Sequence, residues 1–281
     1  MPMTINTNVM SLNAQRNAAT NDSSLASSLQ RLSSGLRVNS AKDDAAGLAI
    51  ASKMDSQARG MNVAVRNSND GISLVQTAES GMAVIGDMLQ RMRELSVQAT
   101  NGTNTSGDLV ALNQEYAQLQ SEIMRTMSSV EFNGTSLLNT TNAFEFQIGA
   151  NSGQTLSIAS SDISITAGLA SISGVAASAL ISTATNGASA NSANIVAIDT
   201  VISAINGSRA ILGAVQNRFN YTITFLQSAS ENQQAARGRI MDADFAQETA
   251  NLSRAQILQQ AGTAMVAQAN QLPQGVLALL R

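Results

Sequence analysis

The sequence predicts a mainly α-helical protein: a long helical bundle or coiled-coil rod from the N- and C-terminal segments, with a β-hairpin and a small irregular or β insert in the middle. Three observations predict this fold class. Apolar residues recur at alternating steps of three and four on both sides of the chain's centre, as in packed helices. Residues 144–158 alternate with a period of two instead, which is typical of strands. The stretch between Asp162 and Asp199 carries no charge, which separates it from the charged helical tracts.

The N-terminal half should contain several helices. Leucines from Leu25 to Leu36 follow a 4,3,4 spacing, and their stripe stops near residues 33–35, Ser-Ser-Gly. Asp70 is expected to cap the start of a following helix, and one heptad register continues from there to Ala99. A further helix begins near Asp108 with the same spacing, so the two should pack as an antiparallel helical hairpin.

The C-terminal half predicts one long helix. Apolar residues from Ile198 to Ile240 keep a single register over roughly 40 residues, which corresponds to about 60 Å of helix. Before it, Phe144 to Ile148 and Leu156 to Ile158 alternate on either side of Asn-Ser-Gly, which predicts a β-hairpin. Residues 163–190 are rich in Ser, Ala, Thr, Ile and Gly and should form short strands or loops.

The composition excludes many kinds of chemistry. Because the 281 residues include no Cys and no His, the chain lacks the usual zinc ligands, thiol nucleophiles and general bases. A net charge of −3 with scattered basic residues argues against nucleic-acid binding. Close carboxylate pairs occur at Asp43 with Asp44 and at Asp242 with Asp244, where we interpret them as helix caps and solvated charges. We therefore expect no enzyme activity, no cofactor and no metal.

The C-terminal tail is apolar but not a membrane span. Residues 255–280 carry no charge, yet seven Gln and Asn side chains would each take an unpaired amide into hydrocarbon. Apolar residues in the tail step by four and three: Leu258, Gly262, Met265, Ala269, Leu272, Val276 and Leu279. This seam predicts packing against partner helices. The first 15 residues lack a basic segment followed by an apolar run, so we expect no cleaved secretory signal.

Several segments identify a family. The chain contains INTNVMSLNAQRN, LQRLSSGLRVNSAKDDAAGLAI, EFNGTSLLN and, near its end, GRIMDADFAQETANLSRAQILQQAGTAMVAQANQLPQGVLALL. Together with intervening segments, these resemble bacterial flagellins over residues 4–158 and 195–281, in the family's order. The hook–filament junction proteins share the terminal pattern without this dense match, and they remain an alternative, as does a secreted coiled-coil adhesin. Many flagellins carry large outer domains where this chain has about 35 residues.

The resemblance implies a subunit that assembles into the flagellar filament outside the cell and transmits motor torque for swimming. It implies an inner-tube helix at 1–40, a helical rod at 41–160 with a hairpin near 143–158, a variable surface insert at 161–194, a long rod helix at 195–240 and an inner-tube helix at 241–281. The tails of free flagellin are disordered and fold on assembly. The expected self-assembly residues of the inner tube are Ile5, Val9, Leu12, Leu258, Met265, Leu272, Val276 and Leu279.

The resemblance also implies partners besides copies of the chain. An export chaperone is expected to hold residues 255–281, a cap complex to guide folding at the filament tip, and junction proteins to anchor the base. Export would use the flagellar type III route, without a cleaved signal and without membrane insertion. Arg91, Leu95 and Glu115 match positions at which flagellins contact the vertebrate Toll-like receptor for flagellin. The same residues could instead join facing helices or neighbouring subunits.

Overall fold

The computed structural model describes residues 7–165 and 187–278 and divides into two compact units. The terminal unit comprises Met1–Ala58 and Glu231–Arg281, and the central unit comprises Arg59–Ser230. Five long helices account for most of the described chain: α1 (Val9–Ser34), α2 (Ala45–Ala99), α3 (Ser106–Ser129), α6 (Gly187–Met241) and α7 (Phe245–Ala278). The mainly α-helical fold class predicted from the sequence is confirmed.

One predicted helix boundary is wrong. Asp70 does not begin a helix, because α2 runs without a break from Ala45 to Ala99. The polar residues before Asp70 bond to the preceding turn of the same helix. The Ser68 hydroxyl donates to the Ala64 carbonyl at 2.8 Å, and the Asn69 amide donates to the Val65 carbonyl at 3.0 Å. Such bonds to the preceding turn are compatible with a continuous helix.

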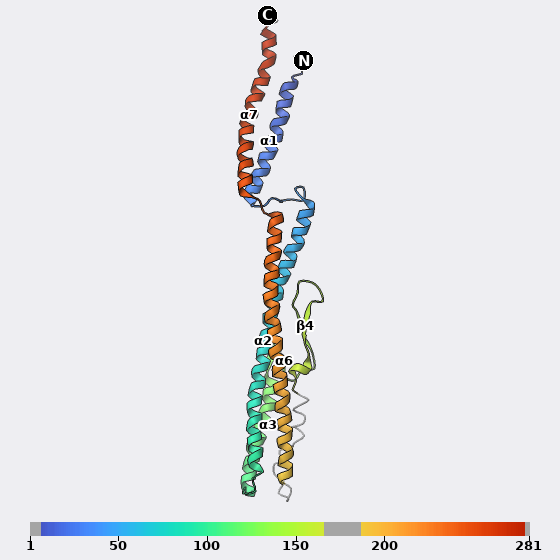
Figure 1. Ribbon diagram of the computed structural model, residues 1–281, viewed down its shortest axis with the longest axis vertical. Helices are drawn as coiled ribbons and strands as arrows, with labels where there is room; N and C mark the ends of the chain where they lie inside the picture. Colours follow the sequence, from blue (N-terminus) through green and yellow to red (C-terminus); the bar gives the residue numbers. More distant parts are fainter. Residues whose placement is uncertain (1–6, 166–186, 279–281) are drawn as a thin grey trace. The chain divides into compact units, whose positions relative to one another are not determined.

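The central unit buries one large apolar core where α2, α3 and α6 run side by side (Figure 1). The predicted heptad stripes supply most of it, and deeply buried members from these stripes include Ile85, Met92, Tyr116, Ile123, Val201, Leu212 and Phe219. Met82 and Leu89, which lie outside the predicted register, are also fully buried, whereas the predicted Met88 is only partly buried. Helix α3 starts as a capping box, in which the Thr105 side chain and the Asp108 carboxylate each bond the other's backbone N–H. Because α2 and α3 share this core and Arg91 of α2 bonds to Glu115 of α3, the expected helical hairpin is confirmed.

Two β-hairpins accompany these helices. Strands β3 (Phe144–Gln147) and β4 (Thr155–Ile158) pair antiparallel as predicted, with Phe144 opposite Ile158. The Phe146 ring meets the Phe219 ring edge-on at 5.6 Å between centroids, which attaches the hairpin to α6. Strands β1 (Glu131–Phe132) and β2 (Thr135–Ser136) form a second hairpin that the sequence reasoning missed.

Part of the predicted insert is helical. A short helix, α4 (Ser160–Ile163), precedes residues 166–186, which lie outside the described residues together with most of the predicted loops or strands. Helix α6 begins at Gly187, so the expectation of short strands or loops is wrong for residues 187–190. By length and composition Ser192–Met241 could cross a membrane, but a core helix meets the same criterion, and the apolar stripe of α6 lies in the core.

Candidate assembly surface

Helices α1 and α7 pack against each other in antiparallel directions within the terminal unit. Contacts recorded along the pair join an early residue of α1 to a late residue of α7, and the reverse: Asn8 with Ala269, Ser11 with Asn270, Ala18 with Gly262, Asp22 with Gln259, and Arg31 with Glu248. The chain's two ends therefore form one two-helix structure.

The seam between α1 and α7 consists of small and polar groups. In α1 the buried residues are Ser11 and Ser28, and in α7 Ala255 and Ala269 are buried. A Cβ atom on Gly262 would make an ordinary contact with Ala18 Cβ at 3.7 Å, so small residues of the two helices face each other there. Such a seam buries little apolar surface, so it contributes little hydrophobic stabilisation by itself.

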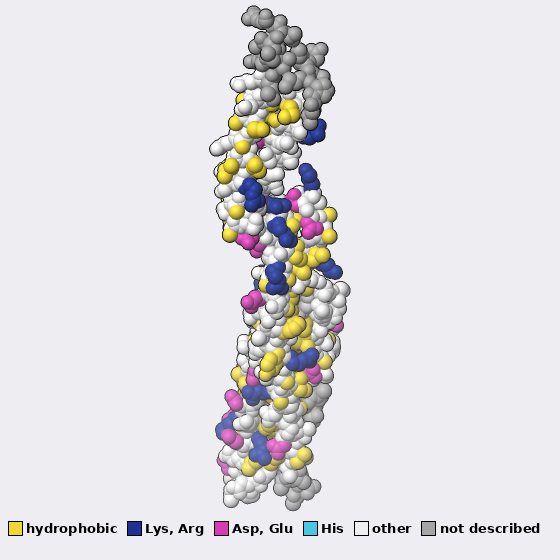
Figure 2. Space-filling view, turned by 45° about the horizontal axis from the view of Figure 1, so that its top comes forward, with side chains coloured by type: hydrophobic (Ala, Val, Ile, Leu, Met, Phe, Trp, Pro, Cys, Tyr) yellow, Lys and Arg dark blue, Asp and Glu magenta, His cyan; other side chains and the backbone are white. Residues whose placement is uncertain are grey.

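Several larger apolar side chains of both helices are exposed, whereas Leu25, Leu32, Leu252 and Val266 are half-buried. Val9 is 65 % exposed and Met265 is 63 % exposed, and the same pattern holds for Met10, Leu12, Leu29, Phe245, Ile257 and Leu258. Figure 2 shows hydrophobic side chains on the surface of this part of the chain, among mostly uncharged atoms. These residues lie around the outside of the two helices, and we call the surface that they form together the outward apolar face of the terminal pair. An apolar face of this kind marks an interaction site.

The structure divides the seam predicted from the C-terminal sequence. Gly262 and Ala269 contact α1, whereas Leu258 and Met265, which lie within about 60° of them around α7, are exposed, as are the predicted Val9 and Leu12. Ile5 and Leu279 lie outside the described residues. Leu272 and Val276 belong to α7, but their side chains are likewise outside the described part of the structure.

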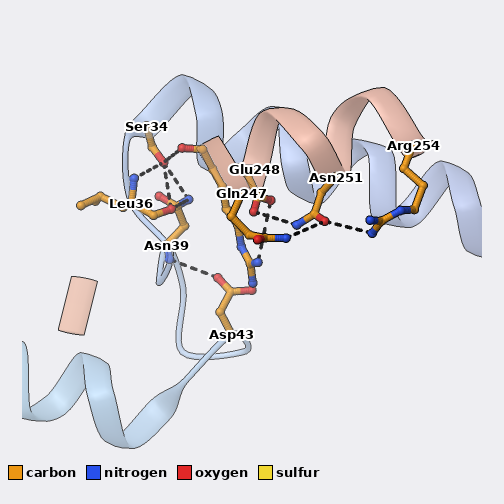
Figure 3. Close-up of polar contacts among 9 residues, drawn as sticks. Ser34, Leu36, Asn39, Asp43, Gln247, Glu248, Asn251 and Arg254 are labelled. Carbon is orange, nitrogen blue, oxygen red and sulfur yellow. Dashed lines mark hydrogen bonds and ion pairs between the residues drawn. The ribbon is translucent and has the colours of Figure 1, made fainter. Parts of the chain in front are cut away.

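Glu248 is the one buried charged side chain among the described residues, with 7 % of its surface exposed. Its carboxylate lies 3.9 Å from the Arg31 guanidinium of α1 and accepts a hydrogen bond of 3.3 Å from the Asn251 amide (Figure 3). A buried charge of this kind needs its partner, because losing it leaves the charge desolvated and unpaired. This pair therefore fixes α1 against α7 near the linkers.

The linker after α1 and the linker before α7 are joined through their backbones. The Arg37 N–H donates to the Met241 carbonyl at 2.6 Å, and the Ala243 N–H donates to the Gly35 carbonyl at 2.9 Å. Gly35 ends α1 with φ 72°, a left-handed conformation that glycine adopts without strain. The start and end of the chain are thus tied together before each enters its terminal helix.

One carboxylate of each predicted pair, Asp44 and Asp244, caps a helix. Asp44 accepts from the Gly47 N–H at 2.8 Å, and Asp244 accepts from the Ala246 N–H at 2.9 Å, at the starts of α2 and α7. Hydrogen bonds from the Ser40 hydroxyl and then from the backbone lower the pKa of Asp43 below its usual value. Within the described residues, no cluster of three acidic side chains is placed to hold a metal ion.

The three predicted receptor residues differ in exposure. The Arg91 guanidinium donates to Glu115 at 2.8 Å and to Glu94 at 2.9 Å, all three side chains being largely exposed. These bonds, led by the one to Glu115, raise the pKa of Arg91. Leu95 is only 1 % exposed and lies in the core of the central unit. The surface therefore offers Arg91 and Glu115 together, without the leucine.

One surface feature of the central unit was missed by the sequence reasoning. On α6, Tyr221 is 78 % exposed and Phe225 is 69 % exposed, although aromatic residues make up only 3 % of the chain. Both fall outside the heptad register that places Phe219 in the core. Their spacing of four residues, which puts two aromatic rings on one helix face, was the available signal.

A helical protein whose ends pair through small residues, while larger apolar side chains face outward, has the properties of a structural subunit made for self-association. Comparisons with known proteins identify the family. The model of the bacterial flagellin N-terminal helical region matches residues 5–143, and that of the C-terminal helical region matches residues 195–280. The chain belongs to the bacterial flagellins, and it is a structural subunit of the flagellar filament, an extracellular appendage formed by self-polymerisation.

Individual relatives agree with this assignment. The chain is 47 % identical over 280 residues to a flagellin of Halalkalibacterium halodurans, covering 99 % of this chain and 100 % of that protein. It is 42 % identical over 290 residues, with the same coverage, to the flagellar filament 33 kDa core protein of Treponema phagedenis. A structure assigned to a flagellar hook-associated protein of Vibrio parahaemolyticus covers 71 % of this chain and 100 % of its own, with a TM-score of 0.60 and 14 % identity, which shows the fold alone.

Proposed function

We propose that the outward apolar face of the terminal pair is the surface on which copies of the chain pack to form the inner tube of the filament. The observation that carries this proposal is the distribution of side chains on the two helices. The fully buried residues between α1 and α7 are small or polar, while the apolar Val9, Leu12, Leu258 and Met265 remain exposed. Burying these side chains against neighbouring copies would supply the apolar contacts that the pair lacks. The other predicted self-assembly residues, Ile5, Leu272, Val276 and Leu279, belong to the same proposal.

The small buried area between α1 and α7 also supports the proposal that these helices fold on assembly. Ordering the backbone of a residue costs on the order of 1–2 kcal/mol, and the small seam of α1 and α7 buries too little to offset that cost over two whole helices. The tails of the free subunit are therefore disordered and become helical when neighbours cover them. Folded in the filament, the subunits transmit motor torque along it, and this role requires no catalysis.

Export and its helpers belong to the proposal as well. A disordered C-terminal tail with exposed Ile257, Leu258 and Met265 suits an export chaperone that binds residues 255–281 and prevents early polymerisation. The chain leaves the cell through the flagellar type III route, a cap complex guides its folding at the tip, and junction proteins hold the base of the filament. The absence of Cys suits passage as an unfolded chain, since no disulfide can close a loop.

Recognition by the vertebrate Toll-like receptor would use Arg91 and Glu115. Both are exposed and already joined, so they present a charged pair of fixed geometry. Leu95 would act indirectly, by holding α2 in the core beneath them. Arg91→Ala should weaken receptor binding by the monomer, whereas equal binding of the variant would remove Arg91 from the contact.

The experiment for the assembly surface is polymerisation of a variant with Leu258→Ser and Met265→Ser. Both side chains are exposed and lie outside the central unit, so that unit should unfold at an unchanged temperature by circular dichroism. Seeded filament growth, followed by light scattering and electron microscopy, should fall at least about tenfold.

The matched control carries Val110→Ser and Met124→Ser, which replace exposed apolar side chains of similar size on α3 of the central unit. This control should polymerise within about twofold of the original chain. Normal filaments from the Leu258 and Met265 variant, or an equal loss in the control, would contradict the assignment of the surface.

A further inference from the structure

We infer that the central units of neighbouring copies contact each other through two complementary faces, an aromatic face on α6 and an acidic face on α2. This inference rests on the proposed packing of copies and assigns its contact in the central unit. The aromatic face consists of Arg218, Tyr221 and Phe225, and the acidic face consists of Val84 and Asp87. The occupant of each face is a second copy of this chain.

The aromatic face is unusual for α6. Leu212, Val215 and Phe219 of the same helix are at most 7 % exposed, whereas Tyr221 and Phe225 are the most exposed apolar residues of the described central unit. At 3.6 residues per turn, both lie on one side of the helix, with Arg218 one turn before Tyr221. Exposed aromatic side chains next to an arginine are typical centres of protein–protein interfaces.

Charge indicates what covers this face. The central unit carries seven Arg and no Lys against eleven Asp and Glu, so it is acidic overall. The Arg218 guanidinium forms no ion pair within the described residues, so a carboxylate from outside the chain would complement it. Another copy of an acidic unit is a natural source of that carboxylate.

The acidic face offers the matching groups. Val84 is the most exposed large apolar side chain of α2, at 52 %. Asp87 lies one turn further along the same helix, is exposed, and has no ion pair within the described part of the chain. An apolar group one turn from a free acid on α2 complements aromatic rings one turn from a free base on α6.

The two faces point to different sides of the bundle. Glu79 of α2 contacts Arg209 and Gln216 of α6, so it marks the sides on which these helices meet. Val84 follows Glu79 by five residues and Tyr221 follows Gln216 by five, which turns each about 140° away from that contact. Neither face can close on its own subunit, and each copy keeps one free face of each kind. A heterologous contact of this kind extends into an open array when its rotation does not close a ring, which is what a filament requires.

Charge reversal tests the pairing on the full-length chain. Arg218→Glu alone and Asp87→Arg alone should each lower seeded filament growth at least about tenfold, because like charges would meet across the contact. The double variant restores the opposite charges in exchanged positions and should recover growth to within about threefold of the original chain. A double variant no better than either single variant would overturn the pairing.

Cross-linking provides an independent readout, because the chain has no Cys of its own. In filaments of a Val84→Cys, Phe225→Cys variant, mild oxidation should give a ladder of covalent oligomers on a non-reducing denaturing gel. Single-cysteine variants should give none, since each face meets its complement. Dimers from Phe225→Cys alone would show a self-complementary contact and overturn the inference. The two proposals fail separately. The Leu258→Ser, Met265→Ser variant tests the terminal pair, and the charge-exchanged variant tests the central unit. Loss of filaments in the first together with growth of the second supports both proposals.

Discussion

The central unit and the terminal pair use the same heptad spacing for opposite purposes. In the central unit, the stripe of α2 that includes Ile85, Leu89 and Met92 is completely buried against α3 and α6. In the terminal pair, small residues such as Gly262 meet within the chain, and larger ones such as Met265 face outward. The difference teaches that a heptad stripe predicts a helix with a packing face. Whether that face packs within the chain or against another copy depends on which side chains the rest of the same chain buries.

The largest expected difference concerns a core residue and an outward one. Leu89→Ala should lower the free energy of unfolding of the central unit by about 2–5 kcal/mol, because it leaves a cavity in a fully buried site. Met265→Ser should leave the same free energy unchanged to within about 0.5 kcal/mol. Urea titration of the monomer measures both values. A similar loss in both variants would erase the distinction between the two regions.

Two glycines sharpen the comparison at smaller magnitude. A Cβ on Gly71 would lie 2.6 Å from the buried Phe219 ring, so Gly71→Ala should destabilise the central unit by about 1–3 kcal/mol. The nearest atom to a Cβ on Gly262 is 3.7 Å away, an ordinary contact, so Gly262→Ala should polymerise normally. Thermal unfolding tests the first variant and filament yield the second. A filament defect in Gly262→Ala would show that the terminal helices must approach more closely than this seam requires.

The uncharged tail provides a third test. Gln260 and Gln268 are exposed on α7, where copies of the chain would bring identical side chains together. We predict that Gln260→Glu or Gln268→Glu hinders polymerisation several-fold through like-charge repulsion, and that added salt partly restores it. Growth rates at low and high salt measure the effect. Normal filaments at normal yield would contradict this role for the amides.

The smallest expected effect depends on pH. Hydrogen bonds from the Thr105 hydroxyl and then from its backbone N–H lower the pKa of Asp108 below its usual value. A lowered pKa in the folded state means that the contribution to stability is present above the unfolded pKa, near 4, and is lost as the pH falls through the folded value. Asp108→Asn should therefore flatten the decline in stability below pH 4. Parallel curves for both proteins would exclude the contribution.

The sequence was most informative where a stripe is buried within one chain. Ile85, Leu95 and Phe219 were placed on packing faces correctly because each side chain's burial depends on the neighbouring helices of the same bundle. The boundary at Asp70 failed because a local polar signal is weaker than the packing of a continuous helix. The turn at Asn133 and Gly134, both with positive φ, could have been read from the Asn-Gly pair, a strong hairpin signal.

The candidate site was predictable only in part. Spacing placed Leu258, Gly262, Met265 and Ala269 in one seam, and on a helix these positions span about 60°. Leu258 and Met265 are nevertheless exposed, so they lie at the edge of the face that meets α1. Which of them meets α1 depends on the partner helix, and spacing along α7 alone contains no information about that partner. Arg91 and Leu95 show the same limit, since one side chain is exposed and the other is buried in the core.

Hydrogen–deuterium exchange of monomer and filament tests the central claim most directly, because it reports protection for each helix separately. The account predicts that amides of α1 and α7 exchange quickly in the monomer and become strongly protected in the filament, while α2, α3 and α6 in the central unit are protected in both. Equal protection of the terminal helices in the monomer and the filament would contradict the claim that copies of the chain complete their folding.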